Sequence, residues 1–152
     1  MESIRTFEDL ECWKAGRQLR IFVSKKVLPL LPKNEQFELA TQLKGAARSV
    51  SANIAEGFGR FHYRDNYKFC SNARGSLFEV LDHLITASDE GYLEEEYLIE
   101  GRSLFESTRR LLSGYMSYLQ RSANETSVVR EEDSDDDLAW DRRPAQPITH
   151  HS

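Results

Sequence analysis

Basic side chains in the first half of the chain are of the type that binds nucleic-acid phosphates. Phosphate binding needs clustered positive charge, and single strands also need aromatic rings on which bases can stack. Aromatic side chains lie beside two basic residues, Arg60 and Arg64. These aromatics are Phe58, Phe61, His62 and Tyr63. The candidates for a nucleic-acid interface are Lys14, Arg17, Lys44, Arg48, Arg60, Arg64 and Lys68, with Lys25 and Lys26 as further bases in the same half.

The same charges allow two other interpretations. Charges on a helix usually form its solvated face. The chain is also polarised, because residues 14–26 hold five bases and no acid, whereas residues 79–106 hold nine acids and one arginine. Such complementarity suits a head-to-tail contact between subunits that closes into a ring. RNA binding, a subunit contact and a solvated face therefore remain open.

A second group of polar residues follows a stretch of small residues. Buried polar groups must be paired, so we expect Asn53 and Glu56 to bond backbone or arginine groups. Arg74 is a natural partner for Glu56 or Glu79, which predicts an internal ion pair. A contact with RNA or a partner protein is the alternative role for this end. The predicted structural polar cluster consists of Asn53, Glu56, Arg74 and Glu79.

Catalytic chemistry has little support in the sequence. Ser71, Ser76 and Cys70 have no base at a justified spacing, so nucleophilic catalysis is not indicated. The carboxylates lack the Glu-x-x-His pattern of di-iron bundles. Cys12 and Cys70 are isolated within apolar helical patterns, which predicts buried free thiols and fits a reducing cytoplasm. We expect no catalytic residue, no metal and no cofactor.

Composition indicates one soluble domain. The chain has 152 residues, of which 39% are hydrophobic and 30% charged, enough for a core without crosslinks. The net charge of −5 arises in residues 124–152, which hold eight acidic residues and three arginines. No uncharged apolar run is long enough to cross a bilayer, and the pattern of the first residues leads us to expect no secretory signal.

Apolar periodicity predicts four long helices, at about residues 10–28, 35–56, 63–90 and 94–121. Asp9 and Asn34 are candidate N-caps, Pro29 and Pro32 end the first helix, and Gly91 is the expected residue after the third. Gly57 and Gly59 should supply permissive backbone after the second. We therefore divide the chain into a lead-in (1–9), a four-helix bundle (10–122) and a disordered acidic tail (123–152).

Particular motifs resemble a known family. They are Phe7-x-Asp9-Leu10-x-x-Trp13, Gln42-Leu43, Ala46-Ala47, Asn53-Ile54-Ala55-Glu56-Gly57-x-Gly59-Arg60, Ala73-Arg74-Gly75-Ser76-Leu77-x-Glu79, Gly91-Tyr92-Leu93 and Leu111-Leu112-x-Gly114. From about Phe7 to Gln120 the chain resembles the bacterial ribosomal RNA intervening-sequence proteins. It is also similar to the accessory variability determinant proteins of diversity-generating retroelements. It departs from the family at Gly45, where a base is common, and in its acidic tail.

The resemblance implies an all-α, antiparallel up-down-up-down four-helix bundle assembled as a ring-like homopentamer. Retroelement members bind reverse transcriptase and RNA, and no member is known as an enzyme. We therefore expect a cytoplasmic, non-enzymatic homo-oligomer that acts as a binding or scaffold module. Its expected partners are other copies of itself and RNA or an RNA-associated protein, with no membrane. A purely structural protein–protein assembly is the alternative.

Overall fold

The computed structural model describes residues 3–132, with side chains described through residue 126. Within this range the chain forms four α-helices and no β-strand. The prediction of an all-α protein with four long helices is confirmed. The helices are α1 (Glu11–Phe22), α2 (Leu39–Phe58), α3 (Tyr63–Asp89) and α4 (Glu95–Glu132).

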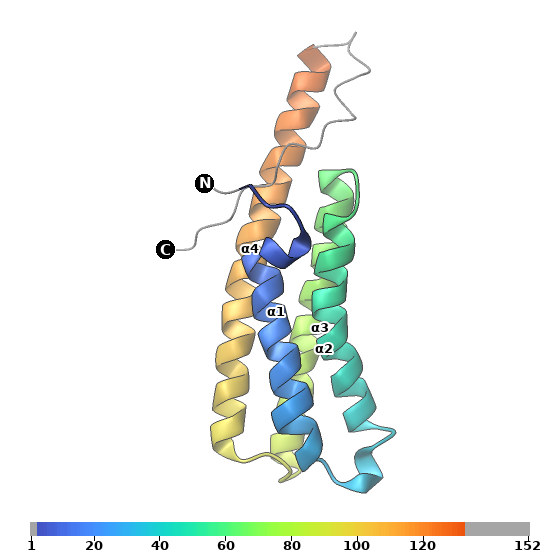
Figure 1. The fold of residues 1–152 in the computed structure, drawn as a ribbon, viewed down its shortest axis with the longest axis vertical. Helices are drawn as coiled ribbons and strands as arrows, with labels where there is room; N and C mark the ends of the chain where they lie inside the picture. Colours follow the sequence, from blue (N-terminus) through green and yellow to red (C-terminus); the bar gives the residue numbers. More distant parts are fainter. Residues whose placement is uncertain (1–2, 133–152) are drawn as a thin grey trace.

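The four helices lie side by side around a common core. The α2–α3 turn lies at one end of the molecule, and the α1–α2 and α3–α4 connections lie at the other (Figure 1). Each helix contacts its sequence neighbour, and α1 also contacts α4. Every helix contributes a fully buried leucine, namely Leu19, Leu43, Leu77 and Leu112. Burial of each such side chain stabilises the fold by about 1.5–3 kcal/mol.

Short helical turns flank the first two helices. A 3₁₀ turn, η1 (Phe7–Asp9), precedes α1, and a π turn, η2 (Val23–Val27), continues it into η3 (Leu28–Leu30). The chain becomes extended at Leu31, one residue after the 3₁₀ turn that contains Pro29. The further 3₁₀ turn η4 (Lys33–Glu35) precedes α2.

Both predicted N-caps are wrong. The Oδ2 atom of Asp9 accepts the backbone N–H groups of Arg5 (3.0 Å) and Thr6 (3.3 Å), so it caps η1 rather than α1. These two bonds hold the pKa of the Asp9 carboxyl below its usual value, and the bond from Arg5 has the larger effect. Asn34 lies inside η4, and α2 begins only at Leu39.

The end of α4 also differs from the prediction. The helix continues to Glu132, although the apolar pattern indicates an end near Arg121. In Figure 1, α4 extends past the other helices at the end that carries the α2–α3 turn. Apolar periodicity reports the packing of a helix, so it stops where neighbouring helices stop. The remainder of the predicted tail, residues 133–152, lies outside the described residues.

The glycines near helix ends have two different functions. Gly91 has a φ of +79° and follows α3, which confirms the predicted C′ residue. Gly59 has a φ of −72° and Gly57 lies within α2, so neither uses the left-handed backbone. Gly57 is instead needed for close packing, because a Cβ there would lie 2.7 Å from Asn66 Oδ1 and 2.9 Å from Phe69 Cβ.

Candidate nucleic-acid interface

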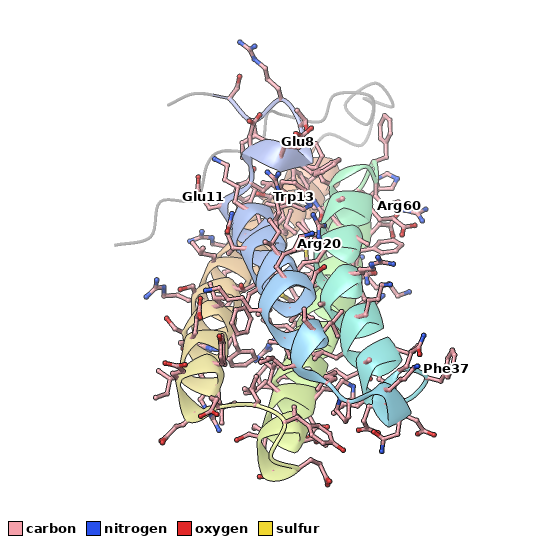
Figure 2. All side chains as sticks on the ribbon, turned by 60° about the horizontal axis from the view of Figure 1, so that its bottom comes forward. Glu8, Glu11, Trp13, Arg20, Phe37 and Arg60 are labelled. Atoms are coloured by element: carbon pink, nitrogen blue, oxygen red, sulfur yellow. The ribbon has the colours of Figure 1, made fainter. Side chains whose placement is uncertain are left out.

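One side of α1 carries a stripe of bases with an aromatic at its end. Trp13, Arg17 and Arg20 are separated by four and three residues, which places them on one side of the helix. The Nη1 atom of Arg20 donates to Ser51 Oγ on α2 at 2.8 Å, so this side lies beside α2. Figure 2 shows Trp13 and Arg20 along the boundary between α1 and α2.

The adjacent side of α2 continues this positive surface. Lys44 and Arg48 are one helical turn apart, and Ser51, the acceptor for Arg20, follows in the next turn. Both bases are exposed. In the part of the chain that the structure describes, neither has an ion-pair partner. We call Arg17, Arg20, Lys44 and Arg48 the α1–α2 basic face.

Neither helix places a carboxylate within this face. No aspartate or glutamate occurs between Cys12 and Asn34 or between Leu39 and Ala55. The nearest acid on α1, Glu11, pairs with Lys14 Nζ at 3.2 Å. Lys14 is therefore exposed but partly neutralised, whereas the charge of the α1–α2 basic face is uncompensated by its own helices.

Trp13 lies at the η1 end of this face, where its indole contacts one aromatic ring and one guanidinium group. The Phe7 ring meets it edge-on, with centroids 5.1 Å apart. The Arg17 guanidinium lies over the indole, 5.8 Å from its centroid. The sequence predicted Arg17 as a base but did not predict its aromatic partner, and it missed Arg20. The intervals from Trp13 to Arg17 and Arg20 were the available signal.

Three predicted bases lie near the α2–α3 turn instead. Arg60 pairs with Glu56 at 3.0 Å, and its guanidinium lies 4.6 Å from the centroid of the Phe69 ring on α3. In Figure 2 it projects outward from the end of α2. Arg64 and Lys68 are exposed on the first turns of α3. The predicted set therefore divides into the α1–α2 basic face and a group at the turn, with Lys14 beside the first.

The predicted polar cluster does not form one bonded group. Asn53 Nδ2 donates to the carbonyl and hydroxyl oxygens of Ser49, both at 2.9 Å, and so stays within α2. The link from α2 to α3 is a hydrogen bond between the hydroxyls of Ser49 and Ser76 at 2.8 Å. Two hydroxyls bond only where helices approach closely, which explains the small residues there.

The expected ion pair of Arg74 is wrong. Arg74 lies over the ring of Phe78, 5.7 Å from its centroid, and pairs with neither Glu56 nor Glu79. Glu56 pairs with Arg60 in its own helix, and Glu79 is exposed. The reason is geometric, since residues four apart on α3 meet each other before they reach a neighbouring helix.

The buried polar groups near the α2–α3 end bond to one another. Asn66 Nδ2 donates to the Tyr115 hydroxyl at 2.9 Å, and the Cys70 thiol donates to Asn66 Oδ1 at 3.5 Å. Burial raises the pKa of Cys70 to about 12 and raises that of Cys12 well above its usual value. Both thiols thus stay protonated at neutral pH, where they are poor nucleophiles. Among the side chains that the structure describes, His, Cys, Asp and Glu form no group of three suited to a metal ion.

Comparison with known proteins gives a family. The protein-family model described as 23S rRNA-intervening sequence protein matches residues 8–114 of this chain. This match spans α1 to α3 and most of the packed part of α4. No curated protein matches the chain. Among the described residues, no helix is both long and apolar enough to span a bilayer.

Proposed function

The chain belongs to the family of 23S rRNA-intervening sequence proteins, and from this premise we propose that it is a non-enzymatic binding module for RNA. The α1–α2 basic face is the proposed contact with the phosphate backbone. The observation that carries the proposal is the pairing state of this face. Lys44 and Arg48 are exposed without ion pairs among the described residues, and no carboxylate from α1 or α2 lies between them and Arg17.

We further propose an antiparallel up-down-up-down bundle that assembles as a cytoplasmic, ring-like homopentamer. The positions of the connections at the two ends support the first part (Figure 1). Two free cysteines fit a reducing compartment. Assembly would present the α1–α2 basic face several times, and such repetition raises the avidity of a weak site for a long polyanion.

A purely structural assembly is the second candidate, and the charge distribution favours it specifically. Exposed acids are concentrated on α3, on α4 and on the connection between them, at Glu79, Asp82, Asp89, Glu90, Glu94, Glu95, Glu96 and Glu106. In this alternative the α1–α2 basic face of one copy contacts the acidic surface of the next. The two functions compete for the same bases, so one pair of variants separates them.

The test compares two double variants that remove equal charge. Lys44→Gln with Arg48→Gln alters the proposed face, whereas Arg102→Gln with Arg110→Gln alters exposed bases of α4. Fluorescence anisotropy with a labelled RNA single strand measures affinity, and light scattering measures the mass of the assembly. Loss of two phosphate contacts should weaken binding about 25-fold at 0.1 M salt for each subunit in contact with RNA. Each contact contributes about 0.7 to log K per tenfold change in salt, counted from about 1 M, where the electrostatic contribution to log K vanishes.

For RNA binding, we expect this loss only in the Lys44/Arg48 variant, with the assembly mass unchanged. The structural alternative predicts a fall in mass and no RNA binding by the unmodified protein. Equal losses in both double variants would show that RNA responds to total charge, and would remove the α1–α2 basic face as the site.

A further inference from the structure

Trp13 lies in line with the basic residues of the α1–α2 basic face but carries no charge itself. It is seven residues from Arg20, which corresponds to about 10 Å along the helix. Its indole is only partly buried. It packs against the hydrophobic core, and the Phe7 ring meets it edge-on. The cation over the ring is Arg17, an exposed residue of the proposed RNA-binding face.

Resting on the proposed function, we propose that Trp13 is a stacking platform for one unpaired base of the bound RNA. Arg17 covers the indole in the free protein, and a base takes its place when RNA binds. The released guanidinium then pairs with a phosphate. Arginine and nucleobases both bind aromatic faces through stacking, so the present occupant marks a surface suited to a planar group.

The geometry favours a single strand over a duplex. A single strand that follows the α1–α2 basic face places its phosphates against Arg20, Arg48 and Lys44. Its next nucleobase then lies beside Trp13. The bases of a duplex are paired and stacked on each other, and the A-form helix is recognised mainly through its backbone and minor groove. A duplex can therefore contact the basic residues of this face through its phosphates but cannot place a nucleobase on the indole.

An exposed aromatic outside the α1–α2 basic face, Phe61, provides a control. Phe61 lies in the α2–α3 turn, is 57% exposed and meets His62 edge-on at 6.0 Å. Its neighbour Arg60 is already paired with Glu56. Phe61 is thus more accessible than Trp13 but lacks the adjoining row of basic residues without carboxylates. Replacement of Phe61 should leave RNA affinity unchanged.

The first experiment uses the fluorescence of Trp13. The chain has two tryptophans, so Trp140→Phe leaves Trp13 as the only one. This full-length variant is titrated with single-stranded RNA, with duplex RNA and with inorganic polyphosphate. We expect single-stranded RNA to quench the tryptophan emission, because a stacked base lies in contact with the indole. Duplex RNA and polyphosphate should bind through charge without comparable quenching.

The second experiment compares Trp13→Leu with Phe61→Leu. Base–aromatic stacking corresponds to a loss of roughly 5- to 150-fold in affinity on substitution. We expect this loss for Trp13→Leu with single-stranded RNA and no change with polyphosphate. Trp13→Phe, which keeps an aromatic ring and disturbs packing least, should lose less. Circular dichroism establishes that each variant is folded.

The outcomes separate the two proposals. RNA binding without quenching, or an equal loss of RNA and polyphosphate affinity in Trp13→Leu, would overturn the stacking role and leave the phosphate-binding face intact. Failure of the unmodified protein to bind RNA or polyphosphate would overturn the proposed function, and the stacking role with it.

Discussion

Substitution of Gly57 by alanine tests the packing that fixes the end of α2 against α3. The new Cβ would lie 2.7 Å from Asn66 Oδ1, 2.9 Å from Phe69 Cβ and 3.0 Å from the Asn66 carbonyl oxygen. Two of these contacts involve backbone or a Cβ atom, which rotamer changes cannot relieve. Asn66 is also held by its bond to Tyr115. The helices must therefore separate locally.

The expected cost follows from the behaviour of overpacked cores. Added methyl groups in such sites destabilise by about 1–3 kcal/mol, which lowers the melting temperature of a chain of this size by about 2–12 °C. Gly45→Ala is the matched control, because a Cβ there meets nothing within 4 Å. Alanine in an open helix interior should instead stabilise by about 0.5–1 kcal/mol. The two variants therefore shift stability in opposite directions.

The assay is urea and thermal unfolding followed by circular dichroism at equal protein concentration, because assembly makes stability concentration-dependent. A Gly57→Ala protein as stable as Gly45→Ala would refute the steric argument. It would also mean that the close packing of α2 against α3 does not require a glycine at position 57.

Three further predictions concern buried or constrained groups. Tyr115→Phe leaves the Asn66 amide without its acceptor and should cost about 1–3 kcal/mol in urea unfolding; no loss would mean that the amide finds another partner. Gly91→Ala, at a φ of +79°, should cost about 1–2 kcal/mol, and an unchanged urea midpoint would contradict the required left-handed turn. The Cys70 pKa rises on folding from 9.0 to about 12, so its contribution to stability is complete below pH 9 and is lost as pH rises towards 12. Unfolding of Cys70→Ala should therefore depend less on pH over this interval, and identical pH slopes would contradict the assignment.

The number and approximate position of the helices could be predicted because burial imposes a period on the sequence. Leu43, Val50 and Ile54 repeat at helical spacing and are fully buried. The ends were less accessible. The 3₁₀ turn η4, which follows Pro32, has no apolar period that would reveal it. The last turns of α4 extend past the other helices (Figure 1), so they carry no apolar stripe that would mark them as helical.

The candidate site was predicted as a set of charges but not as an arrangement. Arg17, Lys44 and Arg48 were identified because their types suit phosphate. Arg20 was missed because its importance depends on Ser51 of another helix. The predicted ion pair of Arg74 was wrong because its guanidinium lies over Phe78, four residues later on the same helix, whereas Glu56 of α2 pairs with Arg60. Partners across helices depend on packing that spacing alone does not specify.

The most direct test of the central claim is the salt dependence of single-stranded RNA binding. The slope of log K against log salt counts the phosphate contacts at about 0.7 each. Lys44→Gln with Arg48→Gln should make this slope shallower by about 1.4 per subunit in contact with RNA, while Arg102→Gln with Arg110→Gln should leave it unchanged. An unaltered slope in the first variant would contradict the assignment of RNA binding to the α1–α2 basic face.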